Sequence, residues 1–182
     1  MSNGIAFGVS GSFVPVDSAT NWLADMASGD YDWAALTLSA VADAAGRQSI
    51  KVDLGVVRPR EWELFGCVDY TLETPVTGSV IDYYWAPSNS GTQANANVAG
   101  NSGGDAACPD GAVPAGITLA EFLDMCVYIG SLTISNDAAV LNGPVGRFIP
   151  STRWGQLIVV NNGGDAFEAD DVEMHQLLLP VA

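Results

Sequence analysis

The sequence predicts an all-β protein, an antiparallel β-sandwich of jelly-roll type with about eight strands. Apolar and polar residues alternate in several stretches, which is the pattern of strands buried on one face. Clusters of Gly, Pro, Asn and Asp separate these stretches, and no long amphipathic helix is visible. A chain of 182 residues fits one domain. We expect this domain to span residues 31–182, behind an extended N-terminal arm at residues 1–30.

The arm is rich in Gly, Ser, Val and Pro and has no sustained periodicity over residues 1–20. Phe7, Phe13 and Val14 are apolar residues of this segment without a partner nearby in the sequence. They are candidates for contact with a neighbouring subunit, while an edge strand of the same domain is an equal alternative. Residues 21–28 could add one or two helical turns.

Three strands are expected to form an antiparallel meander, because connections this short cannot make parallel crossovers. They cover residues 50–56, 62–72 and 79–86, and residues 32–41 upstream also favour a strand. In the third strand, one face carries Ile81, Tyr83 and Trp85, and the other carries Val80, Asp82 and Tyr84. Tyr83 and Trp85, with Trp62 from the second strand, are candidate core aromatics.

A polar loop at residues 88–104 follows this aromatic strand and forms the one long insertion of the sandwich. It consists almost entirely of Ser, Asn, Gly, Ala, Thr and Gln, without apolar periodicity. Loops of this kind on a rigid scaffold are frequent binding surfaces. Its candidate partner-contact residues are Asn89, Gln93, Asn95, Asn97 and Asn101.

The remaining elements are shorter. Thr118 and Glu121 resemble a capping box that starts a short helical turn. In the following strand the apolar phase slips, and a bulge at Gly130-Ser131 would absorb the slip.

The end of the chain supplies two more strands. Residues 154–160 are apolar on both faces, which indicates a central, covered strand, and Trp154 is a fourth candidate core aromatic. Residues 161–165 have strong turn chemistry, and the last strand covers residues 172–181.

The charge of the chain narrows the classes of partner. There are 21 acidic residues against one Lys and five Arg, a formal net charge of −15. Such a surface repels nucleic-acid phosphates and anionic membranes, so neither is an expected partner. No secretory signal is visible, and three scattered cysteines do not form a disulfide framework. Synthesis in a reducing cytoplasm fits these features, with Cys67 and Cys126 buried and Cys108 exposed.

The sequence contains few residue patterns that indicate catalysis or metal binding. His175 is the only histidine, and no serine lies in a nucleophile-elbow pattern. The densest acidic cluster comprises Asp165, Glu168, Asp170 and Asp171. These residues could supply oxygen ligands to calcium, but they match no calcium-binding repeat, and a solvated acidic loop is the simpler interpretation. We therefore expect no enzyme, no metal and no cofactor; an acidic hydrolase ranks far behind the other hypotheses.

Carbohydrate binding is the alternative suggested by the aromatic strand. Sugar rings stack on tyrosine and tryptophan faces, so Tyr83, Tyr84 and Trp85 could bind a glycan with help from the amides of the loop. The competing interpretation places Tyr83 and Trp85 in the core of the sandwich.

Three segments resemble small structural proteins encoded in the virion-morphogenesis regions of tailed bacteriophages. The segments are residues 49–55, 84–91 and 147–162, and the resemblance covers most of residues 47–182. It implies a jelly-roll protein that decorates or cements the outer surface of a capsid, often as a trimer, or else builds a tail or fibre. Its implied partners are the major capsid protein and copies of itself, and it implies no catalytic residue.

Overall fold

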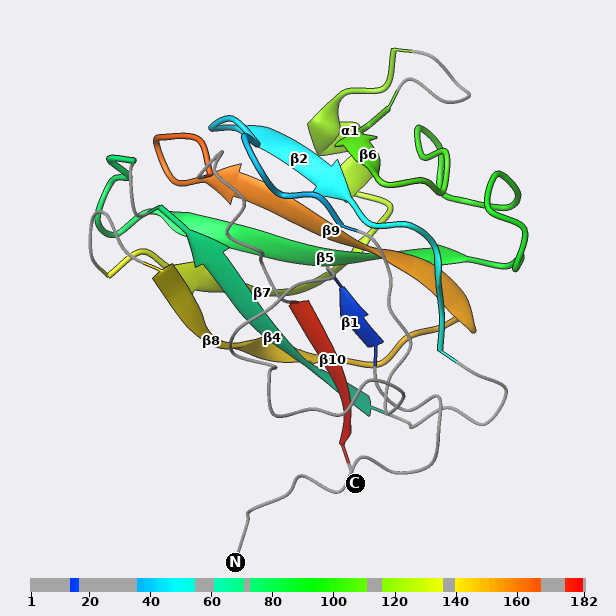
Figure 1. Cartoon of the computed structure of the whole chain (residues 1–182). Coiled ribbons are helices and arrows are strands. Elements are labelled where there is room, and N and C mark those ends of the chain that lie inside the picture. The colour runs from blue at the N-terminus through cyan, green and yellow to red at the C-terminus, as the bar shows by residue number, and fades with distance from the viewer. Residues whose placement is uncertain are drawn as a thin grey trace, which may run out of the picture.

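The strands of the computed structural model form two antiparallel sheets that face each other across one hydrophobic core, an all-β sandwich (Figure 1). The structure describes residues 14–16, 36–54, 61–70, 73–110, 116–135, 140–167 and 176–181. Within these ranges there are ten strands and one short helix, α1 (Leu119–Leu123). The predicted fold class is confirmed, and the jelly-roll type stays a prediction.

The two sheets differ in size. The smaller has the order β1-β10-β4-β8, with bounds Val14–Val16, Gln176–Val181, Glu61–Asp69 and Val140–Phe148. The larger has the order β6-β2-β9-β5-β7, with bounds Ala106–Cys108, Ala45–Gln48, Trp154–Asn162, Val80–Ser88 and Val127–Thr133. The short strand β3 (Val52–Asp53) also pairs with β9.

The predicted three-stranded meander is wrong. β4 belongs to the smaller sheet, whereas β3 and β5 belong to the larger one and both pair with β9. The alternation of apolar residues identifies which side chains face the core, but both sheets bury one face against the same core. The pattern therefore could not tell which strands pair.

Aromatic side chains fill the centre of the sandwich. Trp62 from β4 and Tyr83 and Trp85 from β5 are each 0% exposed. The ring of Trp85 lies 5.4 Å from that of Phe148, centroid to centroid, so β5 and β8 meet across the core. The alternating burial of β5 places these residues inside and leaves Tyr84 on the outer face.

A second apolar cluster lies on the outer face of the larger sheet, beneath α1 and β6 (Figure 1). Phe122 of α1 packs there with Ile158 and Val160 of β9, which explains why β9 is apolar on both faces. The capping box is present: the Thr118 hydroxyl accepts from the Glu121 amide, and the Glu121 carboxylate accepts from the Thr118 amide at 2.8 Å.

The two sheets approach each other where β7 and β8 both bulge. Ile129 is an extra residue of β7 relative to β5, and Val145 is an extra residue of β8 relative to β4. A Cβ atom on Gly130 would collide with the Val145 carbonyl oxygen, and one on Gly146 would collide with that of Ile129. The bulge of β7 lies one residue before the predicted position. Residues 143–146 are part of β8.

Of the predicted N-terminal arm at residues 1–30, the structure describes residues 14–16. Val14–Val16 form the edge strand β1, which pairs with β10 of the same chain, as in the edge-strand alternative. Phe7, Phe13, residues 21–28 and His175 lie outside the described residues. Leu36 and Leu38 are buried, but residues 36–38 form no strand, so the strand expected there is absent from the described part of that segment.

Candidate binding surface

The polar loop at residues 88–104, hereafter the neutral loop, extends from the end of β5 and leads back to β6 (Figure 1). It contains no charged side chain, in a chain of net charge −15. Residues 89 and 91–96 are exposed. A partner can therefore approach this part of the molecule without meeting a charge on the loop itself.

Lys51 holds the tip of the loop. Its ammonium group donates to the carbonyl oxygens of Ser90, Thr92 and Asn95 at 2.9, 2.7 and 2.9 Å. Burial lowers the pKa of the Lys51 ammonium from its ordinary value. The three carbonyl dipoles compensate the charge, since a desolvated ammonium needs all three of its donors satisfied.

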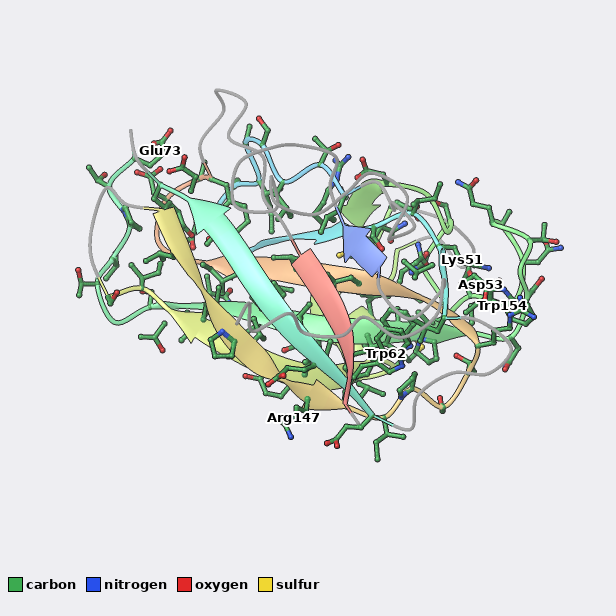
Figure 2. All side chains as sticks on the ribbon, turned by 60° about the horizontal axis from the view of Figure 1, so that its bottom comes forward. Lys51, Asp53, Trp62, Glu73, Arg147 and Trp154 are labelled. Carbon is green, nitrogen blue, oxygen red and sulfur yellow. The ribbon has the colours of Figure 1, made fainter. Side chains whose placement is uncertain are left out.

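The base of the loop rests on the sandwich. The Ser88 hydroxyl donates to the Ala96 carbonyl at 3.0 Å, closing the first turn of the loop. A Cβ atom on Gly91 would lie 3.1 Å from Trp154 Nε1, so the loop backbone touches this ring. The Arg153 guanidinium lies over the Trp154 ring, 4.9 Å from its centroid. Figure 2 shows Lys51 and Trp154 at the same end of the sandwich, with Glu73 at the opposite end.

Amide side chains fix the interior of the loop. Asn97 Nδ2 donates to the carbonyl oxygens of Gln93 and Asn101 at 2.8 and 3.2 Å. Asn101 Oδ1 accepts from the Gly103 amide at 2.7 Å. Gly103 has φ +85°, and a Cβ atom there would collide with the Gln93 carbonyl, so this position requires glycine.

The far end of the loop is anchored to β2. Gln48 Nε2 donates to the Gly104 carbonyl at 3.0 Å and to Asp110 Oδ2 at 3.1 Å. Arg47 forms an ion pair of 2.7 Å with Asp105, the first charged residue after the loop. The Thr37 hydroxyl donates to the same carboxylate at 2.6 Å. The loop is thus tied to the sandwich at its start, its tip and its end.

The predicted contact residues of the loop divide into two groups. Asn89, Gln93 and Asn95 are exposed and available to a partner. Asn97 is half-buried and uses its amide inside the loop, and Asn101 is 5% exposed. Asn101 therefore stabilises the loop and presents no surface to a partner. Trp154, expected in the core, is half-buried at its rim, where it supports the loop.

A second surface lies on the outer face of β5 and β7. Tyr84 and Tyr128 are cross-strand partners whose rings make an edge contact, with centroids 5.2 Å apart. Tyr128 is 53% exposed. Beside them Asp82 accepts a hydrogen bond from Ser131 at 2.5 Å and one from Asn162 at 2.8 Å. Tyr128 and Ser131 also contact each other through their hydroxyl groups.

The bulge at Ile129 builds this second surface. Residues 128 and 131 differ by an odd number and would face opposite sides of a regular strand. The extra residue turns both side chains outward, while Ile129 and Leu132 are buried. The predicted phase slip was the only sequence signal for this arrangement, and Tyr128 was missed. Burial, followed by the nearby Asp82 charge, raises the pKa of Tyr84.

The cysteines and acids do not form a reactive site within the described ranges. Cys108, predicted to be exposed, is 5% exposed in β6, because α1 and Gly46 pack against it. Burial raises the pKa of Cys126 to about 12, which keeps the thiol protonated. No group of three His, Cys, Asp or Glu side chains that could hold a metal ion occurs in the parts of the chain described.

Asp165 is the described member of the acidic cluster, and it has a structural role. Its carboxylate accepts from the Thr74 amide and hydroxyl at 3.1 and 3.0 Å, which lowers its pKa. Glu168, Asp170 and Asp171 lie outside the described residues. The one helix of the described residues, α1, is too short to cross a membrane.

Comparison of the chain with models of protein families, with curated proteins and with solved structures finds no match. Two surfaces of the molecule, the neutral loop and the outer face of β5 and β7, are therefore the candidates for a functional role.

Proposed function

We propose that this protein is a non-enzymatic structural component of a tailed-bacteriophage virion, which decorates or cements the outer surface of the capsid. Its partners are the major capsid protein and other copies of itself, assembled as a trimer. The resemblance of residues 49–55, 84–91 and 147–162 to such proteins motivates the proposal. The observation that supports it best is the neutral loop, which is uncharged, exposed at its tip and fixed by Lys51.

A fixed loop suits a protein that binds to a repeating surface. Ordering a loop on binding costs free energy, so a loop already held in one conformation loses less. The absence of charge on residues 88–104 lets the loop approach a partner that is itself acidic. Each contact can be weak, because many symmetric copies bind the same shell.

The test combines mass spectrometry of purified virions with binding of the protein to capsids assembled without it. We expect the protein in the virions and saturable binding to the outside of the capsids. Absence of the protein from purified virions would overturn the proposal. Its presence on isolated tails alone would overturn the capsid location and favour a tail or fibre component.

Two charge variants locate the contact. Gln93→Glu with Asn95→Asp adds two negative charges to the loop with little change in shape, and we expect about tenfold weaker capsid binding, or about 1.4 kcal/mol. Val76→Glu with Thr77→Glu adds the same charge at the opposite end of β5, where both residues are exposed. We expect this control to bind as the wild type does. Equal losses in both variants would argue against the loop as the contact.

Carbohydrate binding is the second candidate function, and of the three aromatic residues suggested for it by the sequence only Tyr84 lies on the outer face. Tyr83 and Trp85 are 0% exposed and cannot stack on a sugar. Tyr84 and Tyr128 instead present an aromatic pair on the outer face, next to the Asp82 carboxylate. This pair is the specific observation in favour of the second candidate.

A further inference from the structure

We propose that the outer face of β5 and β7 binds a neutral saccharide, with a sugar ring stacked on Tyr128 and a sugar hydroxyl donating to Asp82. This inference deepens the second candidate function by naming its site and ligand class, and it does not depend on the capsid role.

Tyr128 offers a ring that is both exposed and fixed. It is 53% exposed, and the edge contact with Tyr84 at 5.2 Å, with 64° between the ring planes, restrains it. The hydroxyl group is held by Ser131 and lies 3.5 Å from Asp82. Tyrosine has few side-chain torsions to order, so such a ring binds at low entropic cost. An apolar sugar face can replace water on it.

Asp82 supplies the polar part of the site. Its Oδ1 atom accepts from Ser131 and Tyr128, and its Oδ2 atom accepts from Asn162. A carboxylate oxygen can accept two hydrogen bonds, so Oδ2 has capacity for one more donor. Its three described donors, Ser131, Tyr128 and Asn162, carry no charge. A sugar hydroxyl next to the Tyr128 ring is a donor of the right kind.

The charge of the protein selects among saccharides. The chain has a net charge of −15, and Asp82 adds a carboxylate at the site itself. A sialylated or uronic-acid sugar carries a negative charge, which both the Asp82 carboxylate and the net charge of the protein would repel. The combination favours a neutral sugar with free hydroxyl groups.

The experiment is saturation-transfer NMR with a panel of neutral oligosaccharides (glucans, galactans and mannans) and two anionic ones, sialyllactose and oligogalacturonate. We expect binding of a neutral member and a loss of about tenfold in affinity, or about 1.4 kcal/mol, in Tyr128→Ala. Asp82→Asn, which removes the charge but keeps the shape, should also weaken binding. Ile149→Ala removes another exposed apolar side chain, 60% exposed, and should leave binding unchanged.

Several results would overturn the proposal. They are no binding of any neutral member, equal binding of the anionic members, or full binding by a Tyr128→Ala variant whose unfolding midpoint is unchanged. Weaker capsid binding by Tyr128→Ala without saccharide binding would assign this face to the capsid instead. Failure of saccharide binding with the protein still present on capsids removes this site and leaves the virion role standing.

Discussion

Lys51 is the only lysine of the chain, and it holds the tip of the candidate binding loop. It follows residues that anchor the far end of the neutral loop, and its side chain reaches the carbonyl groups at the tip. Three backbone carbonyls that converge on one point repel each other unless a donor lies between them. The conformation of the loop tip therefore depends on this ammonium group.

Replacement of Lys51 by Met should release the loop, because Met has similar length but no donor. We expect faster amide hydrogen exchange over residues 89–97 and a loss of about 1–2 kcal/mol in the free energy of unfolding. Arg147→Met is the matched control, since it removes one positive charge from β8, away from the loop (Figure 2). Unchanged exchange in Lys51→Met would show that the amides of the loop suffice to hold it.

Single residues were the least predictable level of the structure. Asn101 and Asn95 are the same residue type in the same polar segment, yet one is buried and the other is exposed. The Asn101 side chain accepts from the Gly103 amide two residues on, but the loop is so rich in Asn and Gly that this local pattern does not single out one residue. Cys108 was misplaced for a similar reason, because its burial comes from α1, which lies later in the chain.

At the scale of elements, the paired bulges of β7 and β8 close one side of the sandwich. Edge strands are exposed to unwanted pairing, and bulges are one way of protecting them. Here the two bulged edges approach so closely that Gly130 and Gly146 each lie against a carbonyl of the facing strand. The same bulge of β7 orients Tyr128 outward, so closure of the sandwich and the proposed saccharide site share one cause.

Gly146→Ala should therefore be costly. The new methyl group would collide with the Ile129 carbonyl, which cannot move without shifting the bulge, and we expect a loss of about 1–3 kcal/mol in the free energy of unfolding. Gly143→Ala in the same strand is the control, because its Cβ atom would meet only Leu132 Cδ2, at 3.8 Å. Urea unfolding of both variants measures the difference. Similar stability of the two variants would contradict the close approach of β7 and β8.

Elements were more predictable than pairings. The burial pattern of β5, the two apolar faces of β9, the capping box at Thr118 and the slip near Gly130 all follow from local sequence. The position of β4 does not, because its partners β8 and β10 lie far along the chain. Pro144 lies within β8, which is an edge strand of the smaller sheet, where proline is tolerated.

At the scale of the whole molecule, several polar and titratable side chains are buried, both in the main core and in the second apolar cluster. Tyr70 donates to Asn161 at 2.7 Å, and Asn161 donates in turn to the carbonyl groups of Val41 and Asp165. Cys108 lies in the cluster beneath α1, and Cys126 packs at its edge. Titration of these buried groups makes the stability of the whole fold depend on pH.

The fold should lose stability in alkali. Burial raises the pKa of Cys108, Cys126 and Tyr70 above their ordinary values of 9.0, 9.0 and 10.0. The folded state therefore keeps protons that the unfolded chain releases, so this stability is complete below pH 9.0 and declines as the pH rises. One pH unit above its unfolded pKa, each thiol lowers the free energy of unfolding by about 1.4 kcal/mol.

Urea unfolding measured between pH 7 and pH 10 at constant ionic strength tests this expectation, because repulsion among the acids is already complete at neutral pH. Cys126→Ala is the control, since it removes one titrating thiol. Whatever its stability at pH 7, its decline toward pH 10 should be smaller than that of the wild type by about 1.4 kcal/mol. Equal slopes for the two proteins would mean that the Cys126 thiol ionises as readily in the fold as in the unfolded chain. The outer cluster beneath α1 would then be open to water.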